Sequence, residues 1–145
     1  MKTIKVENLE AMTAFAVEFA ATLKGGEIIG LVGDLGAGKT TFVQIVAAAL
    51  GAKIKVHSPT FVLMRRIPMN GGKKLEIKVL VHADAYRIAS EKEMIDAGFW
   101  DLAGRDDSVT FVEWADRMPS LHRLDAYREL TLRPGKGEIR EIDLQ

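Results

Sequence analysis

The chain contains 145 residues, of which 20 are Lys or Arg and 20 are Asp or Glu, so its formal net charge is zero. This length suits a single domain, residues 1–145, and the balanced charge argues against a protein that binds nucleic acid on its own, since such proteins carry a basic excess. The absence of cysteine excludes disulfides, thiolate–zinc sites and cysteine nucleophiles. Polar first residues and the lack of a long apolar run predict a cytoplasmic protein without a membrane segment.

Hydrophobic spacing and turn residues predict three helices. Apolar residues recur at helical spacing over residues 9–23, and two consecutive glycines end this pattern. A glycine-rich loop precedes the second helix, which Gly51 is expected to end. Ser90 and Glu93 have the spacing of a capping box at the start of the third. The predicted helices cover residues 9–23, 40–50 and 90–98.

Strand signals occupy much of the remaining chain. Short apolar runs precede the glycine-rich loop and end in "SVTFVE", and "KIKV" alternates between lysine and apolar residues. The segments "PMNGGK" and "RPGKG" each lie between two strand-like runs, which predicts two antiparallel hairpins. Strands are predicted at residues 27–32, 53–56, 61–67, 74–83, 108–113, 127–132 and 138–144. Early alternation with helices and later hairpins together predict an α/β fold with a mixed, partly parallel central sheet flanked by helices.

The stretch "GDLGAGKT", residues 33–40, matches the pattern GxxxxGK[ST] between a predicted strand and a predicted helix. Glycines allow several backbone N–H groups to point inward, and the start of the following helix favours an anion. Lys39 is expected to reach the β- and γ-phosphates of a nucleotide, and the Thr40 hydroxyl to ligate Mg²⁺. The predicted nucleotide-binding residues are Gly33, Asp34, Leu35, Gly36, Ala37, Gly38, Lys39, Thr40 and Thr41.

Phosphoryl transfer beside such a loop needs a carboxylate at the end of a neighbouring strand, to position Mg²⁺ or to activate water. Asp84 and Glu113 each follow an apolar run, so both are candidates for these roles. The segment "HSPTF", residues 57–61, offers Thr60 as a further hydroxyl for Mg²⁺ or the γ-phosphate. His82 is expected to be structural, because no metal-ligand pair accompanies it.

Missing motifs narrow the class of nucleotide-binding protein. The guanine-recognition tetrapeptide N-K-x-D does not occur, which favours ATP over GTP. The signature of ABC-type ATPases does not occur either, and the chain is short for a P-loop motor. A small-molecule or nucleoside kinase stays open as an alternative, and it should carry an arginine-bearing lid and an acceptor pocket. The residues alone therefore predict a small, Mg²⁺-dependent ATP-binding domain.

Four motifs together resemble one family. They are "GDLGAGKTTF" (33–42), "SPTF" (58–61), "HADAYR" (82–87) and "VEW" (112–114). Their order and spacing resemble the bacterial TsaE family, also called YjeE, of tRNA threonylcarbamoyladenosine biosynthesis ATPases. The resemblance covers almost the whole chain. It implies a P-loop ATPase fold with a mixed sheet, and a role in forming threonylcarbamoyladenosine beside the anticodon of tRNAs.

The resemblance also implies how such a protein takes part in the modification. In this family the ATPase does not perform the carbamoyl transfer itself. It acts on a complex of two sugar-kinase-like proteins, TsaD and TsaB, and its ATP cycle supports turnover there. tRNA would then be held mainly by these partners, which agrees with the zero net charge.

The same resemblance implies roles for individual residues. Lys39 and Thr40 match the phosphate and Mg²⁺ positions of the family. Glu113 matches its Mg²⁺-binding glutamate before tryptophan. Asp84 matches an aspartate needed for hydrolysis, and Thr60 matches the threonine of a switch-like loop. The expected site therefore holds Mg²⁺ through Thr40 and Glu113, with water oriented or activated by Asp84.

Some positions depart from the family pattern or extend it. The family often has a threonine in the first helix where this chain has Met12, which leaves open whether that helix contacts the nucleotide. Ala83 replaces a usual aromatic residue and is expected to alter packing alone. A basic residue near the last strand is expected to approach the nucleotide, with Arg140 the first candidate and Arg133 the second. No arginine finger is recognisable in the sequence, so hydrolysis is expected to be slow without a partner.

Overall fold

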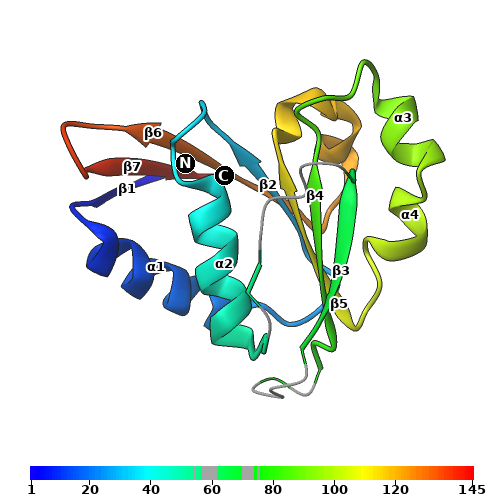
Figure 1. The fold of residues 1–145 in the computed structure, drawn as a ribbon, viewed down its shortest axis with the longest axis horizontal. Coiled ribbons are helices and arrows are strands. Elements are labelled where there is room, and N and C mark those ends of the chain that lie inside the picture. Colours follow the sequence, from blue (N-terminus) through cyan, green and yellow to red (C-terminus); the bar gives the residue numbers. More distant parts are fainter. Residues whose placement is uncertain (54, 57–61, 70–73, 75) are drawn as a thin grey trace.

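The fold is that of a computed structural model, which describes residues 1–53, 55–56, 62–69, 74 and 76–145. Within these residues, seven strands form one sheet in the order β1-β7-β6-β2-β5-β4-β3 (Figure 1). The strands are β1 (Lys2–Val6), β2 (Ile28–Val32), β3 (Met64–Pro68), β4 (Val79–Asp84), β5 (Ser108–Glu113), β6 (Tyr127–Pro134) and β7 (Arg140–Leu144).

The described helices are short apart from the first two. They are α1 (Leu9–Thr22), α2 (Lys39–Leu50), α3 (Glu91–Asp96) and α4 (Phe99–Leu102), with two 3₁₀ helices, η1 (Ala115–Arg117) and η2 (Pro119–Arg123). None of the helices in the described part of the chain is long and apolar enough to cross a membrane.

The centre of the sheet is parallel and its edges are antiparallel. Strand β2 pairs in parallel with β5 and β6, and β5 pairs in parallel with β4. At the two edges, β3 pairs antiparallel with β4, while β7 pairs antiparallel with β6 and β1. The predicted mixed sheet is confirmed. Because β2, β4 and β5 run the same way, their carboxyl ends meet at one edge, where the loop after β2 also lies.

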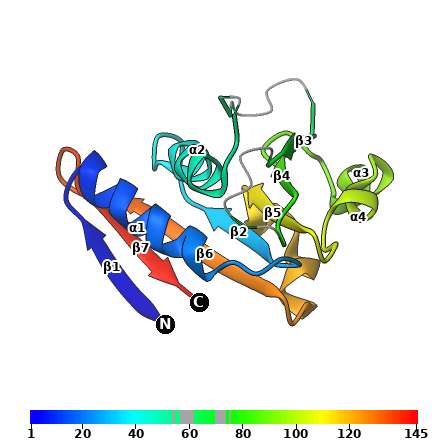
Figure 2. The ribbon, with the colours of Figure 1, turned by 90° about the horizontal axis from the view of Figure 1, so that it is seen from below.

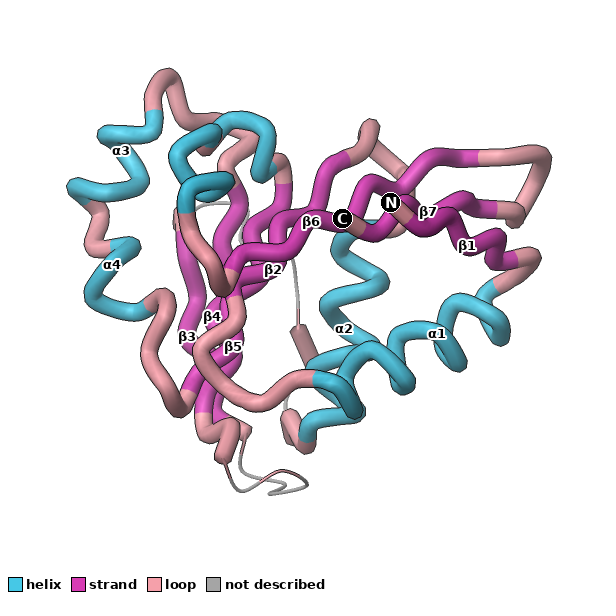
Figure 3. The backbone as a smooth tube through the Cα atoms, turned by 180° about the vertical axis from the view of Figure 1, so that it is seen from behind, coloured by secondary structure: helices cyan, strands magenta, loops and turns pink. Residues whose placement is uncertain are grey.

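Two apolar clusters cover opposite faces of the sheet, as strand alternation requires. On β5, Val109 and Phe111 join the cluster beneath α1 and α2, whereas Val112 joins a second cluster with Met94 of α3 and Phe99 of α4. Figures 2 and 3 show α1 and α2 together on one side, with α3 and α4 near β4 and β5. The sheet is therefore buried on both faces around its parallel centre.

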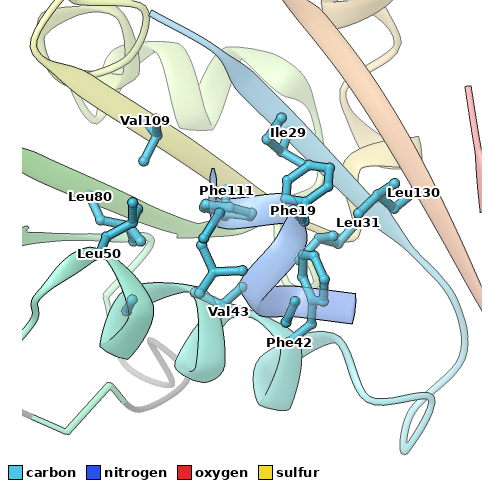
Figure 4. Close-up of a cluster of buried hydrophobic side chains, with 14 of the residues drawn as sticks. Phe19, Ile29, Leu31, Phe42, Val43, Leu50, Leu80, Val109, Phe111 and Leu130 are labelled. Carbon is cyan, nitrogen blue, oxygen red and sulfur yellow. The ribbon is translucent and has the colours of Figure 1, made fainter. Parts of the chain in front are cut away.

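Aromatic side chains fix α2 against the sheet. The Phe42 ring lies 5.4 Å from that of Phe19 on α1 and 6.2 Å from that of Phe111 on β5, measured between centroids. Figure 4 shows these rings among the buried aliphatic side chains of the first cluster. Each such aromatic contact is worth about 1 kcal/mol beyond its buried area. This packing holds the start of α2, and with it the preceding loop, in a set position.

Most predicted elements are confirmed with shifts of a few residues at their ends. The first two helices, the strand before the glycine loop, "SVTFVE" and both antiparallel pairs are present. Gly51 ends α2 in a left-handed conformation with φ of 107°. The capping box at α3 is wrong, because the Ser90 side chain makes no capping hydrogen bond. Instead, the Glu93 carboxylate accepts a hydrogen bond from the Ala89 N–H at 3.0 Å.

Two strand predictions differ from the structure. Residues 53, 55 and 56 are not in a strand, so the prediction for "KIKV" is wrong there. The Val56 carbonyl instead accepts a 2.6 Å hydrogen bond from Gln44 Nε2 of α2, which ties this segment to the helix. Strand β1 lies in the polar N-terminal region, for which no strand was predicted, and β7 supplies its backbone partners.

Asp143 joins three strands at the β1 edge of the sheet. Its carboxylate accepts hydrogen bonds from Thr3 Oγ1 at 2.7 Å and from Arg133 Nη2 at 2.8 Å and Nε at 3.1 Å. The bidentate contact with Arg133 and the Thr3 hydroxyl hold the pKa of Asp143 below its ordinary value. This carboxylate therefore stabilises the fold above the ordinary pKa of aspartate, about 3.9, and the contribution is lost as pH falls through the lowered pKa.

Replacing Asp143 with asparagine should lower the thermal midpoint at pH 7, because the amide lacks the charge that both donors favour. The difference from the unmodified protein should shrink as the pH falls through the lowered pKa of Asp143, where the native carboxyl becomes protonated as well. Thermal melts across pH 3 to 8 measure this. An equal difference at every pH would contradict the electrostatic origin of the effect.

Candidate functional site

Three glycines shape the loop between β2 and α2. Gly33, Gly36 and Gly38 have φ of 153°, 79° and 103°, a region that residues with a side chain rarely adopt. At Gly33 the space is limited as well, since a Cβ there would lie 2.4 Å from the carbonyl oxygen of Leu132 on β6. The loop thus needs glycine both for its turns and for its close approach to the sheet.

Lys39, the first residue of α2, is buried over this loop with 5% of its surface exposed. Its Nζ donates to the carbonyl oxygens of Gly33 at 2.5 Å and Asp34 at 2.8 Å. The ammonium also lies 4.4 Å from the centroid of the Trp114 ring. Burial lowers the pKa of Lys39, and the negative charge of Glu113 opposes that shift. The Lys39 ammonium is therefore bound by two neutral carbonyl groups of the loop, which hold a cation less strongly than an anion would.

The two strand-end acids lie side by side at the same edge of the sheet. Asp84 of β4 and Glu113 of β5 are paired in register. Thr40 Oγ1 donates to the Glu113 carboxylate and lies 2.9 Å from each of its oxygens. Asp84 Oδ1 accepts a 2.9 Å hydrogen bond from the Tyr86 N–H. The structure therefore brings together the loop, the Thr40 hydroxyl and both predicted acids.

His82 belongs to the same group of side chains, although the sequence pattern indicated a structural role. It is fully buried on β4, and its Nε2 lies 2.6 Å from Glu113 Oε2. Residues two apart on a strand share a face, so the spacing of His82 and Asp84 was the available signal. Since no metal-ligand partner accompanied this histidine in the sequence, the contact with Glu113 was missed.

A pocket of about 560 Å³ opens at this site. Of the predicted nucleotide-binding residues, those that line it are Leu35, Gly36, Gly38, Lys39, Thr40 and Thr41. Asp84 and Glu113 also line it, while Gly33, Asp34 and Ala37 lie in the loop without lining the pocket. The pocket thus combines positive, negative and backbone amide groups, which suits a phosphorylated ligand with a bound cation.

Other lining residues were not predicted. They are Val62, Leu63, Tyr86, Arg87 and Trp114. Trp114 has φ of 58°, and it is the non-glycine residue with positive φ in the described part of the chain. Its ring lies 4.9 Å from that of Tyr86, between centroids. This backbone conformation directly after Glu113 turns the indole over Lys39. In the sequence, these residues could be recognised only because they lie in or directly after the motifs "SPTF", "HADAYR" and "VEW".

The predicted nucleotide contacts of Thr60 and Arg140 stay predictions, and whether the first helix contacts the nucleotide stays open. Thr60 lies outside the described residues. Arg140 is the first residue of β7, where its Nη1 donates to the carbonyl oxygens of Gly137 and Ile139, and it is not among the pocket-lining residues. Met12 of α1 is buried, and its terminal methyl carbon lies 3.8 Å from the position that a Cβ on Gly38 would take. The first helix therefore approaches the glycine loop through an apolar side chain.

The donors at the site suit Mg²⁺ that arrives with a nucleotide. Among the described residues, no group of three or more His, Cys, Asp or Glu side chains could hold a metal ion. The Thr40 hydroxyl and the Glu113 carboxylate together offer oxygen ligands from two side chains. Mg²⁺ in proteins commonly uses one or two carboxylates and completes its shell with water and substrate phosphates. The residues present therefore fit a nucleotide-bound Mg²⁺ and not a metal held by protein alone.

A parallel strand, a glycine loop and a helix, with acids at the ends of the neighbouring strands, define the fold class of the P-loop NTPases. A family model, described as threonylcarbamoyl adenosine biosynthesis protein TsaE, matches residues 6–142. The chain belongs to the TsaE family, which takes part in tRNA threonylcarbamoyladenosine biosynthesis. The resemblance inferred from the four sequence motifs is confirmed.

Individual relatives agree with this assignment. The chain is 38% identical over 119 residues to the tRNA threonylcarbamoyladenosine biosynthesis protein TsaE of Aquifex aeolicus, covering 81% of this chain and 79% of that protein. Against the protein of the same name from Bacillus subtilis, it is 38% identical over 114 residues, covering 79% and 65%. The crystal structure of Bacillus subtilis YdiB matches with a TM-score of 0.68 and 28% identity, covering 99% of this chain and 83% of that one. This match supports the α/β fold.

Proposed function

We propose that the protein is a Mg²⁺-dependent ATPase that assists the formation of threonylcarbamoyladenosine in tRNA by acting on a partner complex. It does not perform the carbamoyl transfer itself in this proposal. The observation that carries it is the convergence of Lys39, Thr40, Asp84 and Glu113 on one pocket beside the glycine loop. The proposed partners are the family's two sugar-kinase-like proteins, TsaD and TsaB, through which tRNA is engaged indirectly.

Each of these side chains suits one part of ATP hydrolysis. Lys39 is positioned in the loop to exchange its carbonyl partners for phosphate oxygens, which bind its charge more strongly. Thr40 and Glu113 supply oxygen ligands to the Mg²⁺ of the nucleotide, which neutralises charge on the phosphates when bound. Asp84 lies beside Glu113 in the lining of the pocket and suits the orientation or deprotonation of the attacking water.

The arginine at the pocket supports a dependence on partners. Arg87 lines the pocket but is exposed, and no hydrogen bond or ion pair within the described part of the chain holds its guanidinium. Transition-state charge is stabilised well only by a cation that is fixed in place beforehand. Hydrolysis by the protein alone is therefore expected to be slow, and docking of a partner is expected to raise its rate.

Product analysis tests this proposal against the kinase alternative. ATP turnover is measured for the protein alone, with TsaD and TsaB, and with both partners and tRNA. The expected result is free inorganic phosphate, released slowly by the isolated protein and faster with the partners. Phosphate transferred to a small molecule or nucleoside would support a kinase instead. The absence of stimulation under any of these conditions would contradict the partner-dependent role.

Replacing Glu113 with glutamine should reduce the gain in ATP affinity that Mg²⁺ provides by at least about tenfold. Losing only an outer-shell partner of a metal ligand commonly lowers metal affinity by this factor, and Glu113 is proposed as a ligand itself. Calorimetric titration of ATP at several Mg²⁺ concentrations measures it. Glu129→Gln is the matched control, since Glu129 is a mostly buried glutamate on β6 that pairs with Tyr127 and does not line the pocket. Equal Mg²⁺ dependence in both variants would argue against Glu113 as a ligand.

A further inference from the structure

His82 is a buried polar side chain to which the proposed mechanism of hydrolysis assigns no role. It is fully buried on β4, in the face of the sheet that α2 covers. Leu80, two residues earlier, belongs to the apolar cluster beneath that helix. An apolar side chain would fill such a position without polar atoms to satisfy. The presence of an imidazole there therefore needs a reason other than packing.

Within the described part of the chain, the hydrogen bond of the imidazole goes to the proposed metal ligand. His82 Nε2 lies 2.6 Å from Glu113 Oε2, a short distance typical of a hydrogen bond to a charged acceptor. His82 Nδ1 is buried and has no hydrogen-bond partner among the described residues. A buried acceptor nitrogen without a hydrogen-bond partner is less unfavourable than a buried N–H group without one. The arrangement therefore places the proton on Nε2, from which it is donated to the carboxylate.

Glu113 thus receives hydrogen bonds from two sides. Thr40 Oγ1, at the start of α2, lies 2.9 Å from both carboxylate oxygens, whereas His82 contacts one of them from the neighbouring strand. If Thr40 turns its hydroxyl oxygen to a cation, its hydrogen bond to Glu113 can be lost. The His82 contact comes from within the sheet and does not depend on the loop. It is the contact that can keep the carboxylate in the same orientation with and without a bound nucleotide.

We propose that His82 is a positioning residue that, through Nε2–H, holds the Glu113 carboxylate toward Thr40, ready for the Mg²⁺ of a bound nucleotide. The inference rests on the proposed Mg²⁺-dependent ATP binding. Without this hydrogen bond the Glu113 carboxylate can rotate about its side-chain torsions. Binding of the cation must then also fix the orientation of the carboxylate, which lowers the affinity for the cation. Outer-shell partners of this kind commonly change metal affinity by about 10- to 100-fold.

The test compares two variants of nearly equal shape, His82→Gln and His82→Met. Glutamine carries an amide N–H at a reach similar to that of Nε2, whereas methionine fills the space without a donor. ATP binding is measured by calorimetry in EDTA and at increasing Mg²⁺ concentrations. Thr110→Val is the control, because Thr110 is fully buried on β5 with a hydroxyl that has no partner among the described residues, and it does not line the pocket.

The expected result is a 10- to 100-fold higher Mg²⁺ requirement for tight ATP binding by His82→Met, on the scale known for outer-shell partners. Its affinity in EDTA should be unchanged, and His82→Gln and Thr110→Val should stay close to the unmodified protein. Equal Mg²⁺ dependence in His82→Met and the unmodified protein would overturn the positioning role alone. An equal loss in both His82 variants would also overturn it, since the donor would not matter. If the unmodified protein binds ATP without regard to Mg²⁺, the proposed function fails and the inference with it.

Discussion

Replacing Asp84 with asparagine is expected to lower the rate of ATP hydrolysis by about 100- to 10,000-fold, the usual contribution of a group that accepts or orients a proton. ATP affinity should stay within a few fold of that of the unmodified protein. The asparagine side chain keeps an oxygen that can accept the Tyr86 N–H, so the local turn is retained. Thr40 and Glu113 are also untouched, so the loss falls on the chemical step. Single-turnover phosphate release and calorimetric ATP binding measure the two quantities separately.

The control for Asp84 is Asp116→Asn. Asp116 is an exposed residue of η1, close enough for its charge to act on Lys39, yet it does not line the pocket. A general loss of negative charge near the site would slow both variants to a similar degree. Full hydrolysis by Asp84→Asn in the presence of the partners would contradict the proposed role. If Asp84→Asn keeps its rate of hydrolysis and instead loses the Mg²⁺ dependence of ATP binding, then Asp84 acts as a ligand of the metal.

Replacing Lys39 with methionine should weaken ATP binding by about 100-fold or more, because charged hydrogen bonds to phosphate are worth about 1.5–3 kcal/mol each. The protein without nucleotide should be no less stable. Burial lowers the pKa of Lys39, so the charged ammonium is less favourable in the folded protein than in the unfolded chain. As pH rises through the lowered pKa, Lys39 loses its charge in the folded protein, and the free energy of unfolding of the unmodified protein increases. Any stability advantage of the variant should therefore shrink at high pH.

Lys74→Met is the matched control for Lys39. Lys74 Nζ also donates to two backbone carbonyl oxygens, those of Ala21 and Leu23, each at 2.6 Å, but it does not line the pocket. ATP titrations and chemical denaturation at pH 7 and 10 compare the two variants. If Lys39→Met unfolds far more easily than Lys74→Met, then Lys39 serves mainly to stabilise the loop. Nearly unchanged ATP binding by Lys39→Met would remove the lysine from the proposed phosphate site.

The fold was predictable wherever a strand or helix carries its own hydrophobic pattern. The run ending in Glu113 is buried on both faces, and its boundaries follow from the apolar residues alone. Strand β1 carries no such pattern, since most of its side chains are exposed and its stability comes from pairing with β7. Residues 53, 55 and 56 show the converse, because they belong to an alternating pattern and yet lie outside any strand.

The candidate site was predictable in its loop and in its two acids. Asp84 and Glu113 were each predicted as a strand-end acid beside the glycine loop, and the structure pairs them in register at one edge of the sheet. The spacing of His82 and Asp84 places both on one face of β4, but the contact of His82 with Glu113 also depends on the distance between side chains of two strands. The position of Trp114 over Lys39 depends on a backbone conformation that is rare for tryptophan, so sequence patterns gave no sign of it.

The pairing of β1 with β7 has a consequence for the order of folding. Thr3 and Asp143, which meet across this edge, are 140 residues apart in the chain. Closing a loop of that length costs about 4 kcal/mol of chain entropy, so the contact is favourable only after β7 has already joined β6. We expect β1 to dock last and to detach first. Because β1 lies three strands from β2 in the sheet, such a local opening leaves the glycine loop and both acids assembled.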